Sequence, residues 1–137
     1  MKKLTLVLTV LIALSLLCSC GGAVLNIEAY EWDLVSVTKS SQNGENAREL
    51  SFGGATLVAK NGKITVTDDS TGESFAGTYL QTGANSKGRD YSVEIDSFSG
   101  NGILSISDFY NEESVPTVSF SISDGTGRYI LVFKSKN

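Results

Sequence analysis

The chain has 137 residues, and its 11 Lys and Arg against 15 Asp and Glu give a formal net charge of −4. This acidic balance argues against a nucleic-acid partner, because phosphate backbones are bound through surplus Lys and Arg. Histidine is absent, which excludes Ser-His-Asp and Cys-His nucleophiles and any metal site that needs a histidine ligand. The length suits one domain with a core of ordinary size and is too short for two.

The N-terminal segment is organised like a secretory signal. Lys2 and Lys3 give a basic start, and a mainly apolar run follows from Leu4 to Leu17. About 14 residues at 1.5 Å per residue span roughly 21 Å, which is shorter than a hydrocarbon core of about 30 Å. We therefore interpret residues 1–19 as a signal peptide rather than a membrane span.

The end of this segment, Leu17-Cys18-Ser19-Cys20-Gly21, resembles the lipobox of bacterial lipoproteins. The resemblance implies cleavage before Cys20 and attachment of lipid to its thiol, with two or more acyl chains such as palmitate giving a stable membrane anchor. It places the protein in the cell envelope, on the extracytoplasmic side of the membrane. Gly21 after the lipidated residue implies the outer membrane if the host is Gram-negative. An ordinary secretory signal cleaved near Ser19 is the alternative.

The processed chain is expected to have no thiol available. Cys18 leaves with the signal and Cys20 carries lipid, so the hydrophobic core must stabilise the domain without a disulfide. Nine basic against 15 acidic residues remain, a net charge of −6. We expect residues 20–29 to form the lipidated cysteine and a short tether, and residues 30–137 to form a single domain. Ten residues reach at most about 33 Å, so the domain lies close to its membrane.

The body of the chain alternates apolar and polar residues with a period of two, which is typical of half-buried antiparallel strands. Tyr91, Val93 and Ile95 are one clear example. Asn61-Gly62 accepts the positive φ angles of a type I′ turn and predicts a hairpin. Further turns are expected at 69–72, 83–85, 100–102 and 124–127. The strands are expected at 31–38, 48–52, 55–60, 63–68, 73–81, 89–97, 102–108, 116–123 and 127–134.

These features predict an all-β fold, an antiparallel up-and-down meander of about eight or nine strands. A meander of this length either closes into a barrel or folds over as a β-sandwich. We favour the barrel, because closure removes exposed sheet edges in a chain with no helix to cover them. The final strand, Tyr129–Phe133, is apolar on both faces, as expected for a strand that is covered on both sides.

Trp32 on the first strand, the meander, and Arg128 beside the closing apolar strand resemble lipocalin-like (calycin) barrels. The resemblance implies that Trp32 packs across the closed end of the barrel against Arg128. Tyr30 departs from the family pattern, which has Gly at that position. The segment Phe75-Ala76-Gly77-Thr78-Tyr79 is similar to a stretch of avidin-type barrels, but a single tryptophan does not match their biotin pocket.

Catalytic and metal chemistry find little support in the sequence. Without histidine, acid–base catalysis would require two carboxylates at a defined separation across a cleft, and no spacing indicates such a pair. The segment Asp68–Glu73 places oxygen ligands around a glycine, but it lacks the spacing of an EF-hand and is interpreted as a plain turn. We therefore expect a non-enzymatic protein with no cofactor and no metal.

Two functions from different classes remain, with a two-carboxylate hydrolase as a third that would need a deep acidic cleft. The first is a membrane-anchored lipocalin-like barrel that binds a small apolar ligand at its mouth. Its candidate ligand-binding residues are Trp32, Phe109, Tyr110 and Arg128. A barrel interior that is filled by side chains and has no cavity would exclude this function. The alternative is a protein-interaction module (an adhesin, an assembly subunit or a hydrolase inhibitor) whose acidic surface suits a basic partner.

Overall fold

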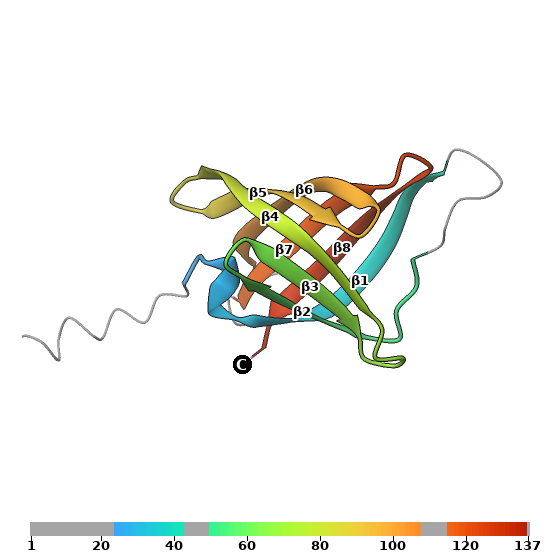
Figure 1. Ribbon diagram of the computed structural model, residues 1–137. Helices are drawn as coiled ribbons and strands as arrows, with labels where there is room; N and C mark the ends of the chain where they lie inside the picture. The colour runs from blue at the N-terminus through green and yellow to red at the C-terminus, as the bar shows by residue number, and fades with distance from the viewer. Residues whose placement is uncertain (1–23, 43–49, 108–114, 137) are drawn as a thin grey trace, which may run out of the picture.

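The computed structural model describes residues 24–42, 50–107 and 115–136. Eight antiparallel strands follow one another in chain order around a closed barrel (Figure 1). This confirms the predicted all-β meander and its closure into a barrel. A short 3₁₀ helix, η1 (Ile27–Ala29), precedes the strands. The strands are β1 (Glu31–Gln42), β2 (Ala55–Lys60), β3 (Lys63–Asp68), β4 (Ser74–Ala84), β5 (Gly88–Ile95), β6 (Phe98–Ser107), β7 (Val115–Ser123) and β8 (Gly127–Ser135).

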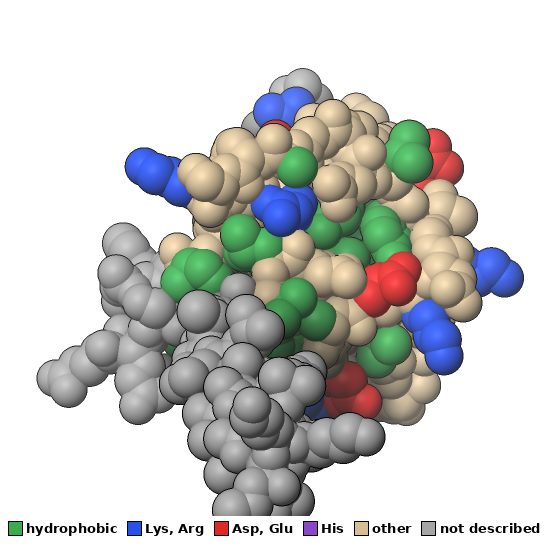
Figure 2. All heavy atoms as spheres, turned by 90° about the vertical axis from the view of Figure 1, so that its left-hand side faces the viewer, with side chains coloured by type: hydrophobic (Ala, Val, Ile, Leu, Met, Phe, Trp, Pro, Cys, Tyr) green, Lys and Arg blue, Asp and Glu red, His purple; other side chains and the backbone are tan. Residues whose placement is uncertain are grey.

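The barrel has two ends, which we name by what lies at each. The η1 end carries η1, the β2–β3 turn, the β4–β5 turn and the end of β8, and the far end carries the β3–β4, β5–β6 and β7–β8 turns. Residues 50–54 lead into the start of β2, which lies at the far end. Figure 2 looks onto the η1 end, where hydrophobic side chains gather near the centre, with basic and acidic side chains both beside them and toward the edge.

Local sequence explains the β2–β3 hairpin. Asn61 and Gly62 have φ angles of 53° and 76°, the left-handed conformation that a type I′ turn requires. The pairing then runs from Lys60 opposite Lys63 to Ala55 opposite Asp68 without a register shift. The predicted hairpin is confirmed.

The predicted strand at 48–52 is wrong for its described part. Residues 50–54 form an irregular connection, not a strand. Leu50 and Phe52 are half-buried and pack against the core. The alternation of apolar and polar residues in this segment therefore arises because these two side chains contact the barrel, although the segment is not a strand of the sheet. The chain therefore has eight described strands and not nine.

The turn predicted at Gly100-Asn101-Gly102 is also wrong, because all three residues lie within β6. A Cβ atom on Gly100 would lie 1.9 Å from the carbonyl oxygen of Ser121, and one on Gly102 would lie 2.6 Å from the ring of Phe120. These glycines allow close packing across the sheet instead of reversing the chain. The turn lies earlier, between β5 and β6, where Asp96 has a φ of 53°.

The turn predicted at 83–85 is displaced in a similar way. Gly83 lies within β4 beside a register shift against β5, and β4 continues to Ala84. Asn85 begins the turn itself, because its side-chain oxygen accepts hydrogen bonds from the backbone N–H groups of Lys87 and Gly88, at 2.8 and 3.0 Å. The turn therefore begins at Asn85, two residues after Gly83.

Large side chains fill the barrel interior. Trp32, Phe120 and Phe133 have no exposed surface, and Tyr129 is 1% exposed. Edge-to-face ring pairs join Phe120 to Phe133 at 6.0 Å and Phe98 to Tyr129 at 5.9 Å. Eight strands enclose a space just wide enough for side chains to fill, and these aromatic residues occupy it. Among the described residues, no helix is long and apolar enough to span a membrane.

Candidate functional site

The η1 helix packs against the end of the barrel. Ile27 is 1% exposed, and its carbonyl oxygen accepts a hydrogen bond of 2.9 Å from Nε1 of Trp32. Asn26 caps the helix by accepting from the backbone N–H of Glu28 at 3.0 Å. Residues 27–29, expected in the tether, are thus packed into the domain. The side chain of Trp32, on β1, therefore holds this helix against the barrel.

A hydrogen-bond cluster links η1 to two strands. Oε1 of Glu28 accepts from the hydroxyl of Tyr79 on β4 and from the backbone N–H of Asn61, the latter at 2.7 Å. The hydrogen bond from Tyr79 lowers the pKa of Glu28. Burial, followed by the hydrogen bond to Glu28, raises the pKa of Tyr79 to about 12. A neutral phenol and an ionised carboxylate therefore hold this end together.

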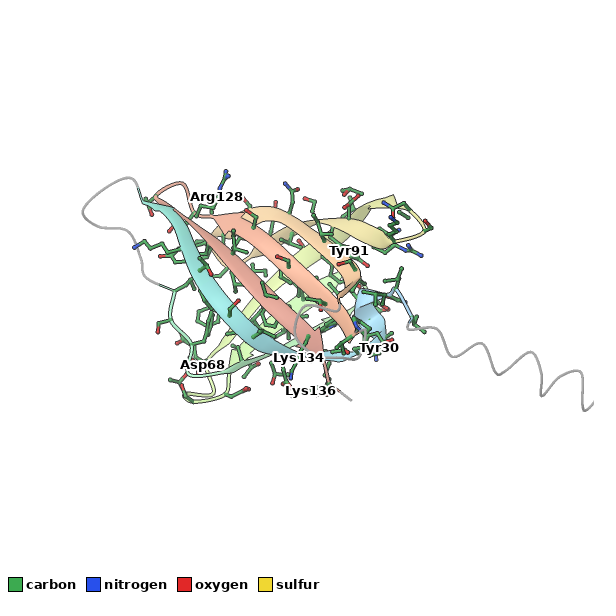
Figure 3. The ribbon with its side chains drawn as sticks, turned by 180° about the vertical axis from the view of Figure 1, so that it is seen from behind. Tyr30, Asp68, Tyr91, Arg128, Lys134 and Lys136 are labelled. Carbon is green, nitrogen blue, oxygen red and sulfur yellow. The ribbon has the colours of Figure 1, made fainter. Side chains whose placement is uncertain are left out.

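The resemblance implied a contact between Trp32 and Arg128, and the structure contradicts it. Trp32 lies opposite Ser135, whereas Arg128 lies opposite Ser41. Nine positions at about 3.3 Å per residue separate the two levels by about 30 Å along β1. Figure 3 shows Arg128 and Tyr30 at opposite ends of the barrel. The antiparallel pairing of β1 with β8 puts the start of β8 beside the end of β1, so this contact cannot form.

Lys136, just after β8, contacts the start of β1 through its side chain. Its Nζ lies 3.3 Å from Oδ1 of Asp33 and 3.6 Å from Oε2 of Glu31. It also donates to Oγ1 of Thr56 on β2 at 3.1 Å. Lys136 therefore joins β8, β1 and β2, a role that the sequence analysis did not identify.

The remaining candidate residues cannot be placed. Cys20, Phe109 and Tyr110 lie outside the described residues. Lipidation of Cys20 and ligand contacts of Phe109 and Tyr110 therefore stay predictions.

An apolar cavity lies inside the far end. Its volume is about 20 Å³, which corresponds to about one water molecule, whereas pockets for drug-sized ligands hold about 300–1,000 Å³. Phe52 and Phe75 meet edge to face at 5.8 Å beside it. The cavity is lined by Leu50, Phe52, Val66, Phe75, Ile95, Asp96, Phe98, Ile122 and Leu131.

Two acidic residues at the far end form turns, as the sequence indicated. Oδ1 of Asp68 accepts from the hydroxyl and backbone N–H of Ser70 at 2.5 and 2.8 Å, which lowers the pKa of Asp68. Oδ1 of Asp124 accepts from Thr126 and Gly127 in the same manner, and its pKa is also lowered. Within the described ranges, no group of three metal-binding side chains is present.

An open groove of about 400 Å³ runs beside β1. One wall is Leu34–Val37 of β1 and the other is the connection Leu50–Gly54. Among the described strands, β2 pairs with β1 only from Glu31 to Asp33, so the groove begins where that pairing ends. The groove therefore lies beside a part of β1 that, among the described strands, is paired only with β8.

The chain matches no family model, and no curated protein or solved structure is similar to it at a significant level. The fold is therefore established by the strand pairing alone. The lipocalin-like resemblance and the functions that it implies stay predictions.

Proposed function

We propose that this protein is a lipid-anchored component of the cell envelope that binds other proteins and carries out no reaction of its own. The observation that supports the proposal is the packed barrel interior. Trp32, Phe120, Tyr129 and Phe133 occupy the space in which a barrel of this kind would hold a ligand. With a cavity of about 20 Å³ at the far end, binding must use the outer surface.

The anchor fixes which end of the barrel faces the membrane. Three residues lie between Cys20 and Val24, which begins the described chain beside η1, and the four residue steps from one to the other extend over at most about 14 Å. The η1 end therefore lies against the lipid surface, and the far end points away from it. A partner reaches the far end and the groove beside β1 from the aqueous side.

The anchor is tested by labelling cells with an alkyne analogue of palmitate. Cys20→Ser abolishes incorporation of the label if the lipobox assignment is correct, and Cys18→Ser, the matched control, retains it. Label on the Cys20→Ser variant would overturn the assignment of the lipid to this residue.

The interaction function is tested by photo-crosslinking in the native envelope. A photoreactive amino acid is placed at Thr38 on β1 or at Ser92 on β5, both of which are exposed. The proposal predicts a crosslinked band of protein size from at least one position. Crosslinks to lipid alone from both positions would contradict it.

A second proposal retains the small apolar ligand, because the cavity at the far end is lined almost wholly by apolar side chains. Such a ligand would have to displace Phe52 from Phe75 before it could enter, since the cavity holds about one water molecule. Phe52→Ala enlarges this space, so a long-chain fatty acid should bind to the variant more tightly than to the parent. Absence of binding to both proteins would remove this second proposal, and equal binding to both would contradict this cavity as the site.

A further inference from the structure

The exposed large hydrophobic side chains of the described residues lie toward one end of the barrel. Leu80 on β4 is 68% exposed, and Ile103 on β6 is 56% exposed. The others are Val24, Val58 and Ile106. Figure 2 faces the η1 end and shows hydrophobic side chains at its surface. Single exposed apolar residues are common on proteins, but a group of them at one end marks a contact surface.

The strand register places Val58 and Ile106 close to the η1 end. Val58 on β2 lies opposite Glu31, the first residue of β1. Ile106 on β6 lies opposite Pro116, the second residue of β7. Both β1 and β7 begin at the η1 end, so these exposed side chains lie near it.

Leu80 and Ile103 belong to the part of the sheet that extends furthest at this end. β4 pairs with β3 only as far as Thr78, whereas its pairing with β5 continues to Ala84. The hairpin of β4 and β5 therefore continues beyond the β2–β3 turn, on the same side of the barrel as η1 (Figure 1). Ile103 lies opposite Asp90, near the start of β5.

The chain leaves the barrel at the same end. The backbone N–H of Val24 donates a hydrogen bond of 2.9 Å to the hydroxyl of Tyr30, which holds the start of the described chain against the domain. The adjacent η1 helix contacts the hairpin, since Tyr79 donates a hydrogen bond to Glu28. With lipid on Cys20, the four residue steps to Val24 bring this apolar group within at most about 14 Å of the lipid attachment point.

The charges at this end are mixed. Its described basic residues are Lys60, Lys63, Lys87, Arg89, Lys134 and Lys136. Its described acidic residues are Glu28, Glu31, Asp33 and Asp90. The sequence that joins β6 to β7, outside the described residues, adds Asp108, Glu112 and Glu113. Because neither sign of charge prevails, contact with lipid is expected to depend on the apolar side chains rather than on anionic headgroups.

We propose that the η1 end of the barrel docks on the lipid bilayer, with Leu80 and Ile103 entering its interfacial layer. This inference rests on the proposed lipid anchor and adds a second, direct contact between the domain and the membrane. Apolar side chains that enter the interface strengthen binding in proportion to the area they bury. A tether alone leaves the barrel free to turn, whereas docking keeps the far end directed toward the aqueous side.

The test measures membrane contact in the full lipidated chain, reconstituted in phosphatidylcholine vesicles. A nitroxide is attached through Ala84→Cys, on the β4–β5 hairpin, or through Glu73→Cys, at the far end, both at exposed positions. Oxygen concentrates in a bilayer, whereas a water-soluble nickel complex is excluded from it. Electron paramagnetic resonance with each reagent should show frequent oxygen and rare nickel collisions at position 84, and frequent nickel collisions at position 73.

Leu80→Glu tests the apolar contact itself. The side chain of Leu80 is exposed, so the substitution should leave the fold intact while it places a charge at the interface. Nickel collisions at position 84 should then become as frequent as at position 73. Ser121→Glu, the matched control at an exposed position toward the far end of β7, should leave them rare. The same loss of protection in both variants would overturn the role of Leu80.

The remaining outcomes separate docking from the anchor on which it rests. If the chain did not float with the vesicles, the anchor would be wrong and this inference would fall with it. If it floated but gave equal nickel collisions at both positions, docking alone would be wrong. Rare collisions with both reagents at position 84 would mean that a second copy of the protein, not lipid, covers this end. Protection only in vesicles of anionic lipid would overturn the apolar basis of docking.

Discussion

Nε1 of Trp32 donates a hydrogen bond of 2.9 Å to the carbonyl oxygen of Ile27, and both residues are buried. This one contact joins the η1 helix to the first strand at the η1 end of the barrel. It gives a hydrogen-bond donor to the carbonyl of Ile27, a residue that is 1% exposed. The tryptophan that resembles a family marker is therefore explained by a contact five residues away in the sequence.

Trp32→Phe should destabilise the protein by about 1–3 kcal/mol, because the buried carbonyl of Ile27 loses its donor while most of the apolar contact is kept. Urea unfolding followed by circular dichroism measures the change. Tyr30→Phe, a half-buried ring beside Trp32, provides a comparison whose expected loss is smaller. Equal losses in the two variants would contradict a special role for the indole hydrogen bond.

Gly102→Ala should destabilise the barrel by about 1–3 kcal/mol, because the added methyl group meets the Phe120 ring in a packed interior. The Cβ would lie 2.6 Å from that ring. Ser99→Ala, at an exposed position of the same strand, should change stability by less than about 0.5 kcal/mol. Thermal unfolding of both variants checks the prediction, and an unchanged midpoint for Gly102→Ala would refute the packing argument.

Ionisation of Tyr79 should weaken the fold at alkaline pH. Its pKa is raised from 10.0 to about 12, so the folded state favours the protonated phenol. The stabilisation is fully present below about pH 10 and is lost as the pH rises toward about 12. Tyr79→Phe should show a smaller decline in stability over this window. An equally steep decline in the variant would assign the pH dependence to other groups.

The ultraviolet absorbance of tyrosinate gives a direct check on the same group. The step that disappears in Tyr79→Phe should be the one near pH 12. Glu28→Gln should move that step to lower pH, because it removes the negative charge that opposes ionisation of the phenol. A step that does not move would mean that burial alone determines the pKa of Tyr79.

Lys136→Gln should lower stability by less than about 1 kcal/mol, and the loss should shrink as salt is added, because exposed ion pairs are weak and screened. Nζ of Lys136 contacts Glu31 and Asp33 while about a third of the side chain is exposed. Lys63→Gln, an exposed lysine on β3, serves as the control. A salt-independent loss would point to packing of the lysine stem instead.

The parts of the fold that could be predicted are those that depend on residues adjacent in the sequence. Asn61-Gly62 specifies a turn by its own backbone preference, so the hairpin was predicted correctly. Gly100 and Gly102 look like turn residues in isolation. In the structure they lie within a strand, where the absence of a side chain leaves room for Ser121 and Phe120 of the neighbouring strand β7. Propensity alone cannot separate these two uses of glycine.

The candidate site was harder to predict because it depends on strand register. Among the described strands, β2 pairs with only three residues of β1, and nothing in either strand indicates so short an overlap. Arg128 was expected beside Trp32, yet the antiparallel register places it at the other end. The side chain of Lys136 contacts the start of β1 instead, and its ion pairs with Glu31 and Asp33 follow from the register and not from any local sequence pattern.

The central claim is that this barrel is filled and binds through its outer surface. Native mass spectrometry of the lipidated protein, released gently from its own envelope, tests it most directly. The account predicts either a protein-sized adduct or the lipidated chain alone, with no small molecule retained. A discrete added mass of a few hundred daltons that Phe52→Ala alters would contradict it, because a ligand of that size needs an interior pocket.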